Sequence, residues 1–263
     1  MNGRYAVMGN PVDHSLSPII HQLFAQQTSR VLTYEKIKIN LPVFEEQVRL
    51  FFHQGGLGLN VTLPCKERAY TLAHHHTPRA AAAKAANTLW RDANGLHADN
   101  TDGIGLLRDL ARYIDLAGKR ILLVGAGGAA RGVLAPLLAA HPAQLTLTNR
   151  TIEKALALSK DFTPVTCCGL SELSEAYDLV INATSASLSD NTLQLPAQIL
   201  TSTTVCYDLA YQLKAPTPFV AWAQSQSCVA IDGLGMLVEQ AAESFAIWHG
   251  VMPDTAPVLA QFR

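Results

Sequence analysis

The chain carries little net charge and few charged residues of either sign. Its 263 residues include 20 Lys and Arg against 21 Asp and Glu, and charged residues make up only 16% of the total. Proteins that bind the phosphate backbone of nucleic acids normally carry an excess of positive charge. The near-neutral balance therefore argues against a nucleic-acid partner, and the 49% of hydrophobic residues excludes a disordered chain.

The sequence also lacks an uninterrupted apolar segment that could cross a membrane. A membrane helix needs about 20 consecutive apolar residues, whereas the most apolar region, residues 121–140, is broken by glycines, an arginine and a proline. The first residues contain no long apolar core of the kind found in secretory signals. We therefore expect a cytoplasmic protein that does not associate with membranes.

No C-x-x-C pair occurs among the five cysteines, which are Cys65, Cys167, Cys168, Cys206 and Cys228. An odd, scattered set of this kind is typical of a reduced, intracellular protein and gives no disulfide framework. The adjacent Cys167 and Cys168 are either a redox pair or, as we favour, two small apolar side chains in the core.

The first hundred residues alternate short strand-like runs with helical ones, which predicts an α/β domain. Pro18 at the first helical position predicts that Ser17 caps a helix. The sequence Asp92-Ala93-Asn94-Gly95 is typical of a tight turn between two strands. The other elements predicted for this block are strands at 5–8, 34–39 and 57–61 and a helix at 42–52.

From about residue 102 the sequence alternates continuous apolar strands with helices. This pattern is typical of a parallel sheet that is covered on both faces. Helical spacing of apolar residues over 104–114 precedes predicted strands at 121–124, 145–148, 179–181 and 204–207. We expect one domain of residues 1–101, completed by C-terminal helices within 236–263, and a second domain of residues 102–235.

A glycine-rich motif follows the first strand of this second block. Gly125-Ala126-Gly127-Gly128-Ala129-Ala130 fits G-x-G-x-x-[G/A] between a predicted strand and a predicted helix. Glycines at these positions allow a tight turn and a close approach of the backbone to a pyrophosphate, which the helix N-terminus also attracts. The motif predicts a dinucleotide site; an ordinary glycine-rich turn is the alternative.

The end of the next strand indicates which dinucleotide binds. A protein that binds NAD usually places Asp or Glu there, to hydrogen-bond the 2′-hydroxyl of the ribose. This chain instead has Asn149, Arg150 and Thr151, with Lys154 one turn later. A guanidinium and an ammonium suit the 2′-phosphate of NADP, although both cations could simply be solvated at a helix start.

Polar side chains recur at strand ends of the first block. Ser15 and Ser17 stand at a predicted helix start, where they could cap the helix or bind a carboxylate. The segments 60–66, 86–88 and 99–103 each place amides, hydroxyls or charged groups next to an apolar strand. Each of these segments could be an ordinary turn or cap, but together they suggest one polar site.

Several of these segments resemble those of the shikimate dehydrogenase family, in the order in which that family has them and over essentially the whole chain. The matching segments are Ser15-Leu16-Ser17-Pro18, Asn60-Val61-Thr62-Leu63-Pro64-Cys65-Lys66, Ala86-Asn87-Thr88, Asn100-Thr101-Asp102-Gly103, residues 125–131, Asn149-Arg150-Thr151, residues 207–211 and residues 233–240. The resemblance implies reduction of 3-dehydroshikimate to shikimate by NADPH.

The resemblance also implies a fold and a set of residue roles. The family fold is an N-terminal substrate domain and a doubly wound, Rossmann-like NADP domain with a cleft between them, and the C-terminal helix returns to the first domain. Lys66 and Asp102 would be the catalytic pair. The substrate would be bound by Ser15, Ser17, Asn60, Thr62, Lys66, Asn87, Asp102, Tyr211 and Gln240. NADP(H) would be bound by Gly125, Ala126, Gly127, Gly128, Ala129, Ala130, Arg131, Asn149, Arg150, Thr151, Lys154, Thr184, Leu209 and Gly233.

The chain departs from the family pattern at three places. The family usually has a glycine shortly after Ser185, whereas residues 186–190 contain none. Lys154 stands where arginine is common, so a bidentate clamp on the 2′-phosphate becomes a point charge. Leu209 stands where methionine is frequent, which conserves volume.

Structural interpretations remain open for three features of the first block. Lys66 could be a solvated lysine at a helix start, and Gln240 could be a water-facing amide beside an apolar helical stripe. The run His74-His75-His76 looks like a metal tract. Adjacent histidines point in different directions, however, and the reaction needs no metal, so we expect none.

Two other functions are also weighed. A quinate/shikimate dehydrogenase of broader specificity is expected to carry an acidic residue where Asn149 and Arg150 stand. A non-catalytic NADP-binding relative is expected to have lost Lys66 or Asp102, and both are present. The partners expected are therefore the small-molecule substrate and NADP(H), and the chain is expected to be a monomer or a homodimer.

Overall fold

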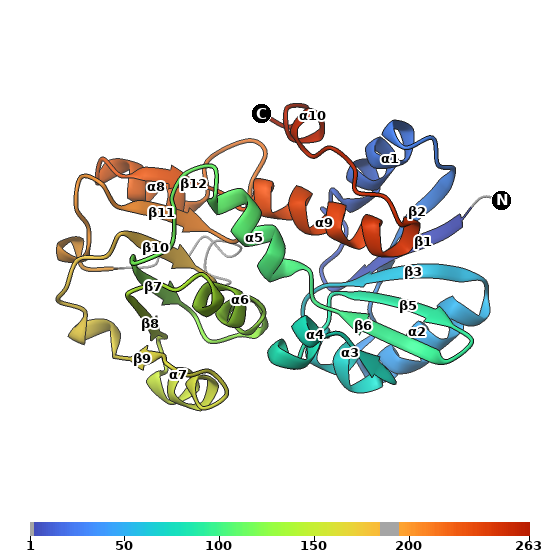
Figure 1. Ribbon diagram of the computed structural model, residues 1–263, viewed down its shortest axis with the longest axis horizontal. Coiled ribbons are helices and arrows are strands. Elements are labelled where there is room, and N and C mark those ends of the chain that lie inside the picture. The colour runs from blue at the N-terminus through green and yellow to red at the C-terminus, as the bar shows by residue number, and fades with distance from the viewer. Residues whose placement is uncertain (1–2, 185–194) are drawn as a thin grey trace. The chain divides into compact units, whose positions relative to one another are not determined.

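A computed structural model describes residues 3–184 and 195–263 of the chain (Figure 1). It divides into two compact units, of which unit 1 comprises residues 1–105 and 237–263 and unit 2 comprises residues 106–236. Both divisions fall inside helices, namely α5 (Asp102–Leu110) and α9 (Leu234–His249). Within the described residues, no helix has both the length and the hydrophobicity that a membrane crossing requires.

Unit 1 is built on a mixed sheet of six strands in the order β2-β1-β3-β5-β6-β4. β1, β2 and β3 are parallel, and β5 runs antiparallel to both β3 and β6. The predicted turn at 92–95 joins β5 to β6 and is confirmed. The strands are β1 (Gly3–Gly9), β2 (Leu32–Lys38), β3 (Gly56–Val61), β4 (His75–His76), β5 (Thr88–Asp92) and β6 (Gly95–Asp99).

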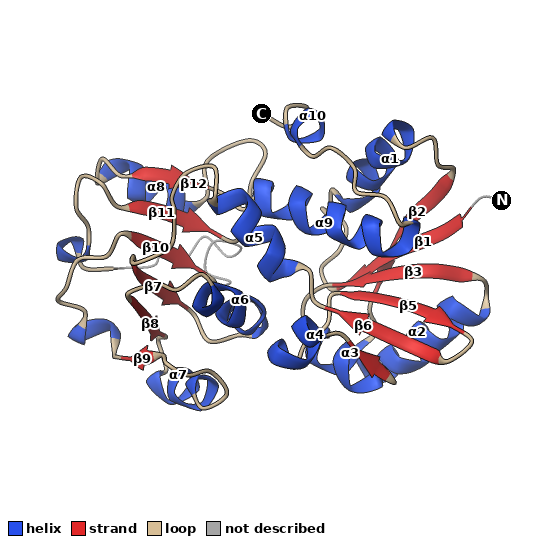
Figure 2. Ribbon diagram, viewed as in Figure 1, coloured by secondary structure: helices blue, strands red, loops and turns tan. Residues whose placement is uncertain are grey.

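Helices cover this sheet on both faces (Figure 2). Alternation along β1 decides what each helix contacts: Ala6 and Met8 pack with Phe44 and Val48 of α2 (Phe44–His53). Tyr5 faces the other way, toward Trp248 of α9. The remaining helices of the unit are α1 (Ser17–Gln27), α3 (Lys66–Leu72), α4 (Pro78–Ala83), α10 (Ala256–Leu259) and the 3-10 turn Leu41–Val43.

Unit 2 contains a sheet of six parallel strands in the order β12-β11-β10-β7-β8-β9. Read from β9, this is the 3-2-1-4-5-6 order of the doubly wound dinucleotide-binding fold. The first three strands are added toward one edge of the sheet and the last three toward the other, so the strand order reverses between the first and fourth strands. The strands are β7 (Arg120–Val124), β8 (Gln144–Thr148), β9 (Thr166–Cys167), β10 (Leu179–Asn182), β11 (Val205–Asp208) and β12 (Val229–Ile231).

The continuous apolar strands of unit 2 are buried from both sides, as their sequence predicts. In β7, Ile121 and Leu123 join a core cluster with residues of α6 (Gly128–Ala139) and α7 (Ile152–Ser159). Leu122 and Val124 point to the opposite face and pack with Phe219 of α8 (Pro218–Ser225). Because both faces of β7 are buried, residues 121–124 form a continuous apolar run instead of alternating apolar and polar residues.

Two local predictions are wrong. Leu16, not Ser17, is the N-cap of α1 and makes no side-chain cap. The oxygen of Ser15 instead accepts the backbone N–H of Ser17 at 3.3 Å, which leaves Ser17 inside the first turn. The helix predicted over 104–114 starts at Asp102 and ends at Leu110, because the following residues form tight turns in which Arg112 N bonds Asp109 O.

Candidate active site

The topology of unit 1 brings the predicted substrate residues to one edge of its sheet. The parallel strands β1 and β3 end at this edge, followed by Ser15 and Ser17 in one case and by Thr62 and Lys66 in the other. β5 is antiparallel to β3 and starts here, directly after Asn87, while β6 ends here before Asp102. Residues far apart in sequence therefore meet because their strands share an edge.

Lys66 and Asp102 form a close ion pair at this edge. Lys66 Nζ lies 2.6 Å from Asp102 Oδ2, and the two side chains are only 14% and 7% exposed. Lys66 is the first residue of α3 and Asp102 the first of α5. The other oxygen of Asp102 accepts a hydrogen bond from Asn87 Nδ2 at 2.9 Å. Lys66 and Asn87 therefore hold the carboxylate from two sides, and the carboxylate in turn fixes the position of the Lys66 ammonium.

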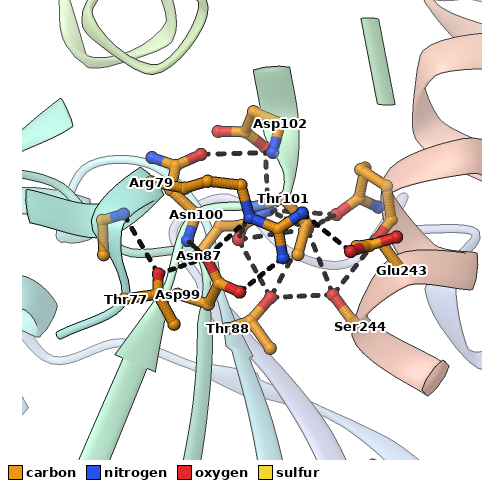
Figure 3. A network of polar contacts seen from close by, with 12 residues as sticks. Thr77, Arg79, Asn87, Thr88, Asp99, Asn100, Thr101, Asp102, Glu243 and Ser244 are labelled. Carbon is orange, nitrogen blue, oxygen red and sulfur yellow. Dashed lines mark hydrogen bonds and ion pairs between the residues drawn. The ribbon is translucent and has the colours of Figure 1, made fainter. Parts of the chain in front are cut away.

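Asn87 is the centre of a polar network around this pair (Figure 3). It is 3% exposed, and its Nδ2 also contacts Thr101 Oγ1 at 2.9 Å and Gln240 Oε1 at 3.1 Å. Its Oδ1 accepts from Thr101 N at 2.8 Å and from Thr88 Oγ1 at 2.9 Å. Every hydrogen-bonding direction of the amide is used, so its orientation is fixed.

Gln240 reaches this network because α9 passes very close to α5. A Cβ placed on Gly105 would lie 2.7 Å from the backbone nitrogen of Gln240, so only glycine allows this approach. The amide of Gln240 donates to Leu237 O at 2.8 Å and presents its oxygen to Asn87. Gln240 is thus part of the polar site and not a water-facing residue at a helix edge.

Three buried hydroxyl groups of the network were not singled out by the sequence analysis. Thr88, Thr101 and Ser244 are fully buried, and Ser244 Oγ lies 2.7 Å from Thr88 Oγ1 and 3.2 Å from Thr101 Oγ1. Thr88 and Thr101 belong to the segments that carry the family resemblance. Ser244 stands four residues after Gln240, on the same face of α9, and this helical spacing is the signal that could have identified it.

Asn60 and the two serines complete the polar residues of this edge. Asn60 Nδ2 contacts Asn87 O at 3.0 Å and Ser244 Oγ at 3.1 Å, which joins β3 to the network. Ser15 Oγ and Ser17 Oγ are 3.1 Å apart. Thr62 N is bonded to Met8 O at 2.8 Å, so Thr62 lies at the same sheet edge and its side chain is half-buried.

An ion-pair cluster beside the network fastens α9 to the sheet. Arg79 of α4 bonds both carboxylate oxygens of Asp99 and contacts Glu243 Oε1 at 2.7 Å (Figure 3). Burial alone would lower the pKa of Arg79, but its hydrogen bonds to Asp99 and Glu243 outweigh burial and raise it. Arg79 therefore stays charged and, through Glu243, holds near the sheet the part of α9 that carries Gln240 and Ser244.

In unit 2, the glycine motif has the geometry that a pyrophosphate requires. Gly125 has φ +114°, and a Cβ there would lie 2.9 Å from the backbone of Ala183, so this turn needs glycine. Gly127 is the N-cap of α6, and no described atom lies within 4 Å of the position a Cβ would take on Gly127 or Gly128. The backbone N–H groups at this helix start can therefore be approached closely.

Some of the residues after β8 have the charge and the exposure that binding of a 2′-phosphate requires. Arg150 and Lys154 are exposed, and among the described residues no hydrogen bond or ion pair uses the guanidinium of Arg150. Asn149 Nδ2 donates to Thr151 O at 2.9 Å and shapes the turn. Arg131 behaves differently from Arg150, because it already pairs with Asp161 at 2.8 Å.

The ends of β10 and β11 are held by a buried carboxylate. Asp208 accepts from Asn182 Nδ2 at 3.1 Å and from Thr217 Oγ1 at 2.6 Å, and Asn182 Oδ1 in turn accepts from Thr184 Oγ1 at 2.7 Å. Gly233 is needed beside β11, because a Cβ there would lie 2.3 Å from Leu209 O. Thr184, Leu209 and Gly233 therefore share the carboxyl edge of the unit 2 sheet.

Two further predictions concern Tyr211 and the segment after Ser185. Tyr211 lies in unit 2, shortly after the end of β11, whereas the other predicted substrate residues belong to unit 1. The missing glycine at 186–190 lies outside the described residues. Both stay predictions.

The three adjacent histidines contact separate partners. His74 Nδ1 accepts from Leu96 N at 3.0 Å, His75 stacks on His97, and His76 lies against Tyr70. Across residues 3–184 and 195–263, no group of three His, Cys, Asp or Glu side chains could hold a metal ion. All five cysteines are free thiols, with Cys167 and Cys168 half-buried.

Comparison with known proteins agrees with this geometry. Family models match the substrate-binding domain of shikimate dehydrogenase at residues 7–89, shikimate / quinate 5-dehydrogenase at 108–209 and the shikimate 5′-dehydrogenase C-terminal domain at 233–261. The shikimate dehydrogenase (NADP(+)) of Legionella pneumophila (strain Lens) is 56% identical over 260 residues, which cover 99% of this chain and 98% of the relative.

Comparison with solved structures also indicates this family. An Ael1 enzyme from Pseudomonas putida has a TM-score of 0.92 at 45% identity, covering 99% of this chain and 98% of its own. Shikimate 5-dehydrogenase from Thermus thermophilus, solved in complex with NADP(H) and shikimate, has a TM-score of 0.88 at 31% identity, covering 98% of this chain and 97% of its own. With all three family models and these relatives spanning nearly its full length, the chain belongs to the shikimate dehydrogenase family.

Proposed function

We propose that this protein catalyses the reversible, NADP(H)-dependent reduction of 3-dehydroshikimate to shikimate, a step in the biosynthesis of chorismate and the aromatic amino acids. The observation that carries the proposal is the buried pair of Lys66 and Asp102, 2.6 Å apart and joined to Asn87 and Gln240 by hydrogen bonds. Relatives of at least 49% identity over nearly the whole chain carry the name shikimate dehydrogenase (NADP(+)).

Reduction of a ketone requires a proton for the carbonyl oxygen while negative charge develops there. The ammonium of Lys66 both stabilises that charge and supplies the proton. Asp102 keeps the ammonium in place through its Oδ2, and Asn87 fixes Asp102 through Oδ1. In the reverse direction the neutral amine of Lys66 takes the proton from the hydroxyl of shikimate.

The remaining polar groups of unit 1 bind and orient the substrate. Ser15 and Ser17 bind its carboxylate with their adjacent hydroxyls, whose oxygens are 3.1 Å apart. The ring hydroxyls are bound by Asn60, Thr62, Asn87, Asp102 and Gln240, and Tyr211 is the remaining residue proposed to bind the substrate.

The residues of unit 2 fit a bound NADP(H). A bound nicotinamide would supply or accept the hydride. The N–H groups of Gly127 and Gly128 bind the pyrophosphate, Arg150 binds the 2′-phosphate and Lys154 adds a positive charge. Asn149 and Thr151 shape that turn, and Thr184, Leu209 and Gly233, at the strand ends, would contact the nicotinamide. Arg131 binds the cofactor only if its ion pair with Asp161 breaks.

We also propose that the protein acts in the cytoplasm as a monomer or homodimer, with no nucleic-acid partner. Oxidation of quinate in addition to shikimate is the second candidate activity, because the family model that matches residues 108–209 covers both substrates.

A steady-state assay with shikimate and quinate, each with NADP⁺ and NAD⁺, tests the proposal. Absorbance of the reduced nicotinamide should rise fastest with shikimate and NADP⁺. Comparable rates with quinate would support the broader activity. A purified, folded protein that oxidises neither substrate with either cofactor would contradict the proposal.

A further inference from the structure

Tyr34 is an aromatic residue that neither the motifs nor the family resemblance assigned to the site. It lies on β2, next to β1, in register with Tyr5. Its hydroxyl donates to Asn60 Oδ1 at 2.7 Å. A tyrosine from a third strand thus bonds directly to a residue that we place in the substrate site.

The other side of the Asn60 amide is committed to the protein interior. Asn60 Nδ2 contacts Asn87 O at 3.0 Å, Thr88 Oγ1 at 3.2 Å and Ser244 Oγ at 3.1 Å. The oxygen atom, which Tyr34 contacts, is therefore the end of the amide that faces a donor, and an amide oxygen can accept two hydrogen bonds. Rotation about χ2 of asparagine is soft and nearly two-fold, so neighbours must fix the orientation.

The ring of Tyr34 is itself held in place by aromatic packing. It stacks on His21, with 4.3 Å between ring centroids and 14° between planes. His21 is fully buried, and burial lowers its pKa to about 3, which keeps this ring neutral near pH 7. Burial also raises the pKa of Tyr34 well above its ordinary value, although a hydrogen bond with Ser17 opposes the rise. The phenol therefore keeps its proton and remains a donor.

We propose that Tyr34 is a substrate-positioning residue: its hydroxyl donates to Asn60 Oδ1 and fixes the Asn60 amide oxygen to receive a ring hydroxyl of the substrate. The inference rests on the proposed function, because it assigns Tyr34 to the same site. Tyr34 makes no contact with Lys66 or Asp102 among the described hydrogen bonds, so it acts on substrate binding and not on proton transfer.

The test compares Tyr34→Phe with the wild type. Loss of one buried hydrogen bond to a binding group weakens affinity by about tenfold. We expect the KM for shikimate to rise by about this factor, with kcat within about twofold of wild type and the KM for NADP⁺ unchanged. Titration of shikimate by calorimetry should show the same loss of affinity.

A matched control is Tyr5→Phe. It removes a phenol hydroxyl from the neighbouring strand, and no described hydrogen bond connects Tyr5 to the site. This variant should keep the wild-type KM for shikimate. A purely structural role for Tyr34 would instead lower stability and affect both substrates alike, which urea unfolding and the KM for NADP⁺ would detect.

Combination with Asn60→Ala completes the test. If Tyr34 acts through Asn60, the effect of Tyr34→Phe on shikimate affinity should shrink to less than about twofold in the Asn60→Ala background. A wild-type KM in Tyr34→Phe, or fully additive effects of the two substitutions, would overturn the inference. A wild-type protein that neither binds nor oxidises shikimate would overturn the proposed function itself, and the inference with it.

Discussion

The charged pair at the site is maintained by the groups around it. Two nearly buried charges are costly unless hydrogen bonds satisfy their remaining atoms. Asp102 meets this condition through Lys66 at one oxygen and Asn87 at the other. Removing Asp102 alone would leave a half-buried ammonium without its partner, so a variant at this position affects both the position of Lys66 and the stability of unit 1.

A substitution of Arg150 tests whether this side chain determines the preference for NADP⁺ over NAD⁺. It is exposed after β8, and its guanidinium makes no hydrogen bond or ion pair within the described residues. Arg150→Ala should raise the KM for NADP⁺ far more than that for NAD⁺, because only NADP⁺ has the 2′-phosphate that a guanidinium binds. Steady-state kinetics with both cofactors measures this. Equal effects on the two KM values would show that Arg150 does not contact the 2′-phosphate.

Single residues differ in how far the sequence could identify them. Lys66 and Asp102 stand in motifs at strand ends, so their residue types and positions in the sequence already indicate chemistry. Ser244 and Tyr34 were missed because a serine in an apolar helix and a tyrosine in a strand usually serve packing. Only the register of β2 with β1, and the crossing of α9 over β3 and β5, place their hydroxyls at the site.

Among the elements, the crossing of α5 and α9 is the one on which the site depends most. Gly105 permits it, because a Cβ there would lie 2.7 Å from the backbone nitrogen and Cβ of Gln240. This contact sets how far Gln240 and Ser244 reach toward Asn87.

The substitution Gly105→Ala tests this crossing, because helix propensity and steric overlap change the free energy of unfolding in opposite directions. In an isolated helix, alanine would be more stable than glycine by about 1 kcal/mol. Here the overlap should instead lower the free energy of unfolding by about 1–3 kcal/mol and raise the KM for shikimate, since Gln240 is displaced. Urea unfolding and steady-state kinetics measure both. A more stable variant with an unchanged KM would mean that the two helices are free to separate.

Helices, strands and turns could be predicted from the sequence where a single local property, such as burial or backbone freedom, determines them. The glycine motif, the turn at 92–95 and the doubly buried strands of unit 2 follow from backbone freedom and burial, and the structure confirms them. The start of α1 was predicted wrongly, because Ser15 and Ser17 are both suited to a position before the helix and the sequence does not say which serine is outside it.

For the whole molecule, each unit carries a core and a polar edge of its own. Unit 1 gathers the residues proposed for the substrate, with the exception of Tyr211, and unit 2 gathers those proposed for NADP(H). The chain order of the motifs, with a C-terminal helix that returns to unit 1, could be inferred from the family resemblance. The pairing order of the strands in unit 1 could not, because sheet order depends on contacts between distant segments.

Stability of the molecule should depend on pH through His21. Burial lowers the pKa of this histidine from 6.5 to about 3 in the folded state. Between these values the unfolded chain binds a proton that the folded chain does not, so stability should fall as pH decreases from about 6.5 toward 3. The contribution of one such group is at most about 1.4 kcal/mol per pH unit.

His21→Phe should reduce this dependence, since a phenyl ring can keep the packing against Tyr34, Phe24 and Phe245 without titrating. Urea unfolding of both proteins from pH 7 to pH 4 measures the two slopes. Parallel curves would mean that His21 is protonated in the folded protein as readily as in the unfolded one. His249, whose pKa burial also lowers, would leave part of the slope in the variant.

The most direct test of the account is the turnover number of Lys66→Ala with shikimate and NADP⁺, measured beside the control Lys160→Ala, which removes an exposed lysine at the end of α7. If Lys66 transfers the proton, its removal should lower kcat by about 10²–10⁴-fold with a smaller change in KM, while the control keeps wild-type kinetics. A folded Lys66→Ala enzyme with a wild-type kcat would contradict the proposed chemistry.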